Sequence, residues 1–211
     1  MKKFLSMILI FVILGAYICA PTYATADFGP ASMESQIRLL KKTEVLSTEP
    51  EEPDSEISRG VFAIYTARLL DESEIGMTER KIFSDVPTES REAYALAKLV
   101  EKGIISGNPD GTFRPNETIT AAEASKMLLN ILDYKYYAEV KGGYPTGYMF
   151  LSKKLGLIST GSADEKMTYR SAISAIYNAL HTAMHDIKNI DGSDIEYEPN
   201  DDVTLLSVYH A

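Results

Sequence analysis

The sequence contains no tryptophan and a single cysteine. That cysteine is Cys19, within the first 26 of the 211 residues. One cysteine cannot form an internal disulfide, so the stability of this chain has to come from packing. The roughly 185 residues that follow position 26 are enough to bury one sizeable core or a few small repeat cores.

Positive charge is also scarce. The chain has 21 Lys and Arg against 30 Asp and Glu, a formal net charge of −9, and loss of the two lysines near the start would leave −11. Phosphate binding needs clustered Lys and Arg, so the composition argues against a nucleic-acid partner and against binding to an anionic membrane surface. The acidity keeps a surface protein soluble and indicates nothing more specific.

The first residues have the pattern of a secretory signal peptide. Two lysines precede an apolar run over residues 4–20, and the small-residue triplet Ala24-Thr25-Ala26 follows. This pattern predicts a signal peptide over residues 1–26, cut after Ala26 or Ala24, and no membrane contact after cleavage. The alternative is an uncleaved membrane anchor, because the run has about the minimum length that spans a bilayer.

Apolar residues recur at helical spacing along the rest of the chain. The spacing i, i+3, i+4, i+7 predicts amphipathic helices separated by polar segments that contain Gly and Pro, so the predicted fold class is all-α. The apolar positions are Met33, Ile37 and Leu40; Phe62, Tyr65, Leu69 and Leu70; Ala93, Leu96, Ala97 and Val100; Ala124, Met127, Leu128 and Ile131; and Ile173, Ile176, Tyr177 and Leu180, with a shorter helix over 149–155.

These helices pair into an internal repeat of helix–loop–helix units. The middle unit is the clearest: FSDVP at 83–87 precedes one helix, KGIISGNPDGTFRP follows at 102–115, and ITAAE at 119–123 opens the next helix. The first unit opens its second helix with ISRG at 57–60, and the third with MTYR at 167–170. One such unit cannot bury its own apolar face, so we expect the units to pack on each other.

The middle unit resembles the S-layer homology domain, whose pattern is roughly F-x-D-V, an apolar helix, G-I-I-x-G-x-x-D-G-T-F-x-P and then I-T-R-A-E-F. The match over 83–133 is long and gapless, whereas those over 33–71 and 144–183 rest on helix spacing and the helix-opening motif. The resemblance implies three repeats packed as a pseudo-threefold bundle. It also implies that grooves between repeats hold a pyruvylated secondary polysaccharide of a Gram-positive-type cell wall.

On this basis the chain divides into five segments. They are a signal peptide over 1–26, repeats over 27–72, 73–133 and 134–190, and a C-terminal tail over 191–211. The first and third repeats are degenerate, and the third lacks the D-G-T-F loop. The third repeat has gained tyrosines, whose rings either stack on sugars or fill half-buried helix interfaces. These are Tyr134, Tyr136, Tyr137, Tyr144 and Tyr148.

Part of the helix-opening motif is structural. A Thr followed three residues later by Glu forms a capping box, in which each side chain accepts a hydrogen bond from the other residue's backbone N–H. Thr120 and Glu123 meet this pattern. Ser58 and Thr168 can also cap, but Val61 and Ser171 stand where the Glu should be, so we expect incomplete boxes there.

The Arg of the family motif is the part that the resemblance assigns to the ligand. At a helix start, where free N–H groups favour an anion, an Arg fork can hold the carboxylate of a pyruvyl ketal. Only the first repeat keeps this residue, as Arg59; the second has Ala121, and the third has Tyr169 with Arg170 next to it. We expect polymer binding by Arg59 with Ser58, and more weakly by Arg170 with Thr168. The alternative is that Arg59 is a solvated residue paired with Glu52, Asp54 or Glu56.

The loop after the third predicted helix contains a tight turn, Asn108-Pro109-Asp110-Gly111, and we expect Phe113 to enter the repeat core. Gly107, Asn108 and Gly111 either line a sugar-binding groove or serve the turn alone. The loop lacks the alternating acidic series of a calcium site.

The sequence carries no enzyme motif that we can identify. His181 and His185 are four residues apart on the last predicted helix, a spacing that can bind zinc, but the Glu of H-E-x-x-H is absent. We predict no catalytic residue, no metal site and no cofactor.

The predicted function is non-covalent anchoring of a secreted protein to a cell-wall polysaccharide at the cell surface, with a possible cargo domain or S-layer partner. One alternative is a structural surface protein whose degenerate repeats no longer bind polymer. The other is a small wall-modifying enzyme that uses the two histidines.

Overall fold

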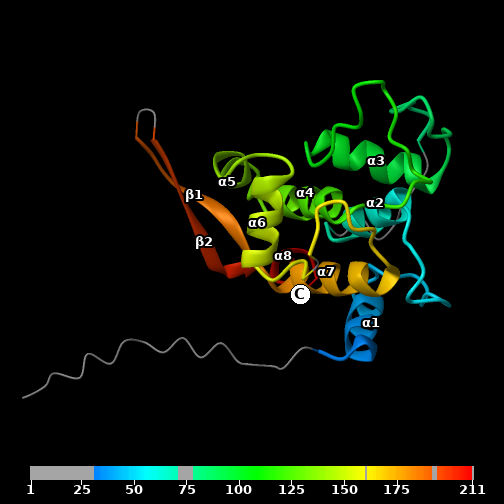
Figure 1. Ribbon diagram of the computed structural model, residues 1–211, viewed down its shortest axis with the longest axis horizontal. Helices are drawn as coiled ribbons and strands as arrows, with labels where there is room; N and C mark the ends of the chain where they lie inside the picture. The colour runs from blue at the N-terminus through cyan, green and yellow to red at the C-terminus, as the bar shows by residue number, and fades with distance from the viewer. Residues whose placement is uncertain (1–30, 71–77, 160, 192–193, 211) are drawn as a thin grey trace, which may run out of the picture. The chain divides into compact units, whose positions relative to one another are not determined.

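The computed structural model describes residues 31–70, 78–159, 161–191 and 194–210 (Figure 1). The predicted signal peptide lies outside these residues, and within them no helix has the length and apolar character needed to cross a membrane. The elements are α1 (Met33–Lys42), α2 (Arg59–Arg68), α3 (Arg91–Glu101), α4 (Ala121–Ile131), α5 (Lys135–Val140), α6 (Thr146–Lys154), α7 (Tyr169–His181), β1 (Ala183–Asp191), β2 (Asp194–Thr204) and α8 (Leu205–Tyr209).

The fold is mostly helical, which confirms the predicted class. The exception is the antiparallel hairpin of β1 and β2, which pairs Ala183 with Thr204 at one end and Asp191 with Asp194 at the other. In the sequence, the pair Gly-Ser at 192–193 was a signal that favours a hairpin. After β2 the chain forms α8, which packs on α7 and buries Leu205 completely.

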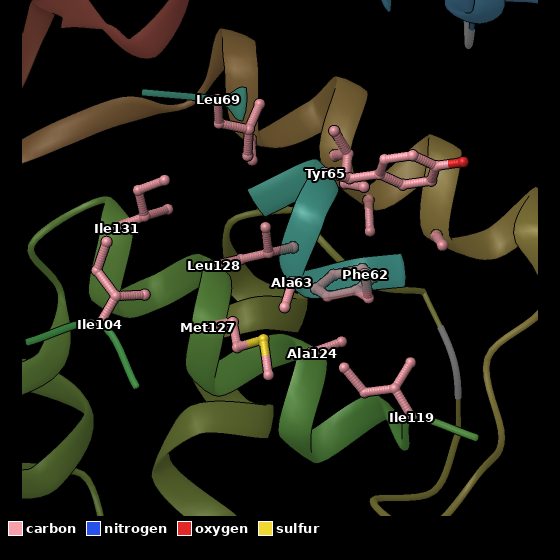
Figure 2. Close-up of a cluster of buried hydrophobic side chains, with 14 of the residues drawn as sticks. Phe62, Ala63, Tyr65, Leu69, Ile104, Ile119, Ala124, Met127, Leu128 and Ile131 are labelled. Atoms are coloured by element: carbon pink, nitrogen blue, oxygen red, sulfur yellow. The ribbon is translucent and has the colours of Figure 1, made fainter. Parts of the chain in front are cut away.

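The centre of the core lies where α2 and α4 face each other (Figure 2), and side chains from the other helices and the loops extend it. Phe62 and Ala63 of α2, Leu69 directly after α2 and Leu128 of α4 are fully buried. Each large apolar side chain among them contributes about 1.5–3 kcal/mol through burial. Around this pair, α3 lies against α2, α6 against α4 and α5, and α7 against α2 and α1. Phe113 is fully buried, as predicted.

Three backbone segments from distant parts of the chain meet in a closed cycle of hydrogen bonds. The N–H of Ile57 donates to the carbonyl of Met167 (3.0 Å), Met167 to Ile119 (3.0 Å) and Ile119 back to Ile57 (3.1 Å). All three side chains are buried. Each buried amide is thereby satisfied by the next segment, which fixes the points where α2, α4 and α7 begin.

The same three helix starts are joined to neighbouring loops. The first backbone N–H groups of a helix have no partner inside the helix and need one elsewhere. Here two N–H groups of each helix donate to loop carbonyls at 2.8–3.0 Å. The pairs are Arg59 to Glu117 and Gly60 to Pro115, Ala121 to Glu165 and Ala122 to Ala163, and Tyr169 to Ser55 and Arg170 to Pro53.

Side-chain caps complete these starts. The Thr120–Glu123 capping box is present, as predicted, and the Ser58 hydroxyl accepts from the N–H of Val61 at 3.2 Å. The expectation of an incomplete box at Thr168 is wrong. The Ser171 hydroxyl accepts from the N–H of Thr168 at 2.9 Å, so a short hydroxyl here replaces the longer Glu carboxylate.

Candidate functional site

A pocket of about 140 Å³ lies where three parts of the chain meet. The start of α2 contributes Arg59, the loop after α3 contributes residues 104–108, and the segment before α6 contributes Tyr144. Glu123, Lys126 and Met127 of α4 complete the lining. Of the predicted polymer-binding residues, the pocket therefore brings together Arg59, Gly107 and Asn108.

Arg59 is held in this pocket by three contacts. Its Nη1 lies 3.1 Å from Glu123 Oε1, its Nε donates to the carbonyl of Phe113 at 3.0 Å, and its guanidinium carbon is 4.6 Å from the centre of the Phe113 ring. Its side chain is only 14% exposed. The alternative of a solvated Arg59 paired with the acidic loop at 52–56 is therefore wrong, because its ionic partner is Glu123.

Glu123 has a second role that the sequence did not reveal. Its Oε2 accepts the capping hydrogen bond from the N–H of Thr120 at 3.0 Å, while its Oε1 pairs with Arg59. One carboxylate thus secures the start of α4 and orients the cation of the pocket. The expectation that free N–H groups at the start of α2 help to hold an anion is wrong, because those of Arg59 and Gly60 donate to loop carbonyls.

The loop residues divide between the pocket and the turn. Gly107 has φ +72°, and a Cβ there would lie 2.2 Å from Phe83 Cε1, so the backbone needs glycine at this point. The Asn108 side chain donates to the carbonyl (3.1 Å) and hydroxyl (3.2 Å) of Thr112. Gly111 has φ +78°, is exposed and is not part of the pocket lining. Gly111 therefore serves the turn.

Asp85 anchors this loop from the preceding FSDVP segment. Its two carboxylate oxygens accept from the N–H groups of Phe113 (2.8 Å) and Arg114 (2.7 Å). Desolvation acts to raise the pKa of Asp85, but these backbone hydrogen bonds outweigh it and bring the pKa below its ordinary value. The ring of Phe83 stacks on that of Phe113, with 5.4 Å between ring centres. Asp85 and Phe83 therefore both restrain Phe113, the residue on which the Arg59 guanidinium packs.

Arg170 and Thr168 lie in a different pocket, of about 250 Å³, together with residues of α7 and the loop before it. Arg170 forms a bidentate ion pair with Asp54: its Nε lies 2.6 Å from Oδ1 and its Nη2 lies 3.0 Å from Oδ2. The hydrogen bond from Arg170 brings the pKa of Asp54 below its ordinary value. Ser58 does not line the first pocket; its hydroxyl caps α2.

A third pocket, of about 290 Å³, has the opposite electrostatic character. Tyr169, which replaces the Arg of the helix-opening motif, lines it with Tyr65, Glu51 and Glu52, and its lining contains no cation. This pocket is therefore poorly suited to an anionic ligand.

The two histidines do not share a helix face. α7 ends at His181, whereas the buried His185 belongs to β1 and lies 4.5 Å from the Tyr134 ring, measured between ring centres. The predicted zinc-compatible spacing on one helix is wrong, because the helix stops before His185. Within the described residues, no group of three or more His, Cys, Asp or Glu is placed to hold a metal ion.

The sequence did not single out Lys126 as a lining residue, whereas Tyr144 was one of five tyrosines proposed to stack on sugars or to fill helix interfaces. Lys126 Nζ lies 5.3 Å from the centre of the Tyr144 ring. Burial raises the pKa of Tyr144, so this side chain stays a neutral phenol at physiological pH. The available signal for Lys126 was its position three residues after Glu123, which places both residues on one helix face.

The comparisons with known proteins give a family for one segment of the chain and several surface proteins as relatives. Residues 82–125 match the model of the S-layer homology domain. The chain is 32% identical over 83 residues to the cellulosome-anchoring protein of Acetivibrio thermocellus, covering 38% of this chain and 19% of that protein. It is 33% identical over 93 residues to the S-layer protein sap of Bacillus anthracis, covering 40% and 11%.

A longer match links the chain to the cell surface protein of Thermoanaerobacter kivui. The two are 23% identical over 211 residues, which covers 94% of this chain and 27% of that protein. This chain therefore spans less than a third of the length of each of these relatives.

Proposed function

Since residues 82–125 form an S-layer homology domain, we propose that this protein anchors non-covalently to a cell-wall polysaccharide through the pocket around Arg59. It is a cell-surface protein, as the family match and the surface, S-layer and anchoring proteins among its relatives indicate. The observation that carries the proposal is the convergence of Arg59, Gly107 and Asn108 in one pocket.

The charge of this pocket favours an anionic substituent. Arg59 and Lys126 give two positive charges and Glu123 one negative charge, so the lining is net positive in a chain with a formal charge of −9. Within the described part of the chain, Arg59 Nη2 makes no hydrogen bond. Because its other contacts fix the guanidinium beforehand, little side-chain entropy is lost on binding. The carboxylate of a pyruvyl ketal fits this arrangement.

Arg170 with Thr168 is the second contact we propose, and a weaker one. An anion there has to compete with Asp54, which already accepts hydrogen bonds from Nε and Nη2 of Arg170. Anchoring without catalysis is also part of the proposal, and the comparisons indicate no catalytic family. We further propose export through the signal peptide at 1–26, a Gram-positive-type wall as the target, and a cargo or S-layer partner.

Co-sedimentation with purified Gram-positive cell walls tests the proposal. We expect binding to untreated walls and loss of binding after chemical removal of the secondary polysaccharide. Arg59→Ala should weaken binding at least about tenfold, the effect of losing one charge-assisted hydrogen bond. The matched control is Arg38→Ala, which removes an exposed Arg of α1 paired with Glu34.

A second candidate is a structural surface protein whose repeats no longer bind polymer. It is favoured by the replacement of the motif Arg by Ala121 and Tyr169, and by the acidic lining of the third pocket. Failure of the unmodified protein to bind walls that carry a pyruvylated polymer would support this candidate and overturn the anchoring proposal.

A further inference from the structure

We infer that Lys126 and Tyr144 select the ligand of the Arg59 pocket, and that this ligand is a single acidic sugar residue. Lys126 supplies the unbalanced positive charge, and Tyr144 supplies a flat face for the sugar ring. The inference rests on the proposed function and extends it, because neither residue belongs to the helix-opening motif or to the loop that carries the family resemblance.

The charge argument begins with the Arg59–Glu123 pair. At 3.1 Å, Glu123 balances the charge of Arg59, whose Nε and ring-facing surface are also occupied. Lys126, in contrast, has no carboxylate within ion-pair distance among the residues that the structure describes. The net charge of the pocket therefore resides on Lys126. Its ammonium group, on a flexible four-carbon stem, can move to meet a carboxylate.

Tyr148 and the packing on α5 restrain the position of Tyr144. Its ring meets that of Tyr148 edge-on, with 6.3 Å between centres, and Tyr148 is fully buried and donates its hydroxyl to Glu139 at 2.9 Å. Close packing on α5 restrains the same segment, because a Cβ on Gly147 would lie 2.0 Å from the carbonyl oxygen of Ala138. Tyr144 is nevertheless 49% exposed.

An exposed ring on a fixed support is suited to stacking. A tyrosine presents a rigid apolar face with a polar tip, which matches a sugar ring that has C–H groups on one face and hydroxyls at its edge. The Tyr144 ring forms one wall of the pocket, and the Lys126 ammonium lies over this ring. When a sugar stacks on that face, the flexible Lys126 stem lets the ammonium move to the acidic substituent, so the two side chains contact neighbouring parts of one ligand.

The size of the pocket limits what it can enclose. Pockets that bury drug-sized ligands measure about 300–1,000 Å³, whereas this one measures about 140 Å³. It has room for one sugar residue with its acidic substituent, while the rest of the polymer stays outside. The specificity for the polymer is then determined by a single sugar residue.

The test uses the whole protein and two wall preparations. One is Gram-positive cell walls that carry a pyruvylated polysaccharide, and the other is the same walls after mild acid has hydrolysed the ketals. We expect Lys126→Gln to weaken binding to untreated walls at least tenfold and to leave binding to treated walls at the unmodified protein's level. Lys126→Arg should restore most of the loss. Lys42→Gln, at the exposed end of α1, is the control for net charge.

Tyr144 is tested on both preparations. Tyr144→Ala should weaken binding to each, since stacking does not need the carboxylate, whereas Tyr144→Phe should bind like the unmodified protein. Thermal unfolding followed by circular dichroism checks that each variant folds.

Two outcomes overturn the inference. In the first, Lys126→Gln binds walls as well as Lys42→Gln does, Tyr144→Ala binds like the unmodified protein, and only Arg59→Ala loses binding. The anchoring proposal then stands and only this inference fails. If the unmodified protein binds neither preparation, the proposed function fails and the inference with it.

Discussion

Glu123→Gln is expected to change stability and affinity in opposite directions. Gln retains one oxygen that can accept the capping hydrogen bond from Thr120, but it lacks the charge that pairs with Arg59. The pair is half buried, with 14% and 31% of the two side chains exposed. Its loss therefore falls between that of an exposed ion pair, about 0–1 kcal/mol, and that of a buried pair broken on one side, about 3–5 kcal/mol. We expect a loss of about 1–2 kcal/mol in the free energy of unfolding.

Affinity for an anionic polymer should rise in the same variant. Removing a negative charge about 6 Å from a bound carboxylate is worth about 0.7–3 kcal/mol for an effective dielectric constant between about 80 and 20. That corresponds to a tightening of about threefold or more. The net positive charge of the pocket grows, and Arg59 no longer shares its Nη1 with the protein.

Wall co-sedimentation and urea unfolding measure the two effects side by side. Glu34→Gln is the matched control, because it removes the same charge from an exposed ion pair on α1. It should leave affinity unchanged and lower stability only slightly. If Glu123→Gln binds walls no better than this control, the pocket does not hold an anion next to Arg59 and the electrostatic argument is refuted.

Three further results are expected. Asp85→Asn should lower the free energy of unfolding by about 1 kcal/mol at neutral pH, after allowance for the exposure of this carboxylate. The depressed pKa means that the unmodified protein loses this contribution as pH falls through about 4 and below, so the difference between the two urea unfolding curves should close in acid; a constant difference would contradict this. Gly107→Ala should lower the melting temperature clearly more than Gly103→Ala does. Both glycines have positive φ, but only at position 107 would an added Cβ lie 2.2 Å from an aromatic carbon; equal shifts would contradict this. Arg170→Ala should weaken wall binding less than Arg59→Ala does, and the reverse order would move the main site to the second pocket.

Local features of the fold were predictable from the sequence. Helical periodicity gave the positions of the longer helices, and the Thr120–Glu123 box depends on contacts only three residues apart. The role of Ser171 was missed because the usual pattern requires Glu or Gln, although a hydroxyl reaches the same N–H. The hairpin was missed because helical repeats were expected up to residue 190.

The candidate site was only partly predictable. The family motif selected Arg59, Gly107 and Asn108, and the structure places all three in one pocket. The partner of Arg59 could not be inferred, because Glu123 is 64 residues away and is explained locally by capping. Lys126 and Tyr144 likewise become neighbours only when α4 and the segment before α6 pack together.

The closed cycle of Ile57, Ile119 and Met167 has a consequence for the timing of assembly. Its first and last members are 110 residues apart, and no member can satisfy its partners until Met167 is present. Contacts of such long range form late and slow the folding of a domain. When the chain is synthesised or exported from its N-terminus, Arg59 therefore emerges well before the residues that pack around it. Under the proposed function, the Arg59 pocket can bind only after Met167 has emerged, so shorter partial chains should not compete for sites on the wall.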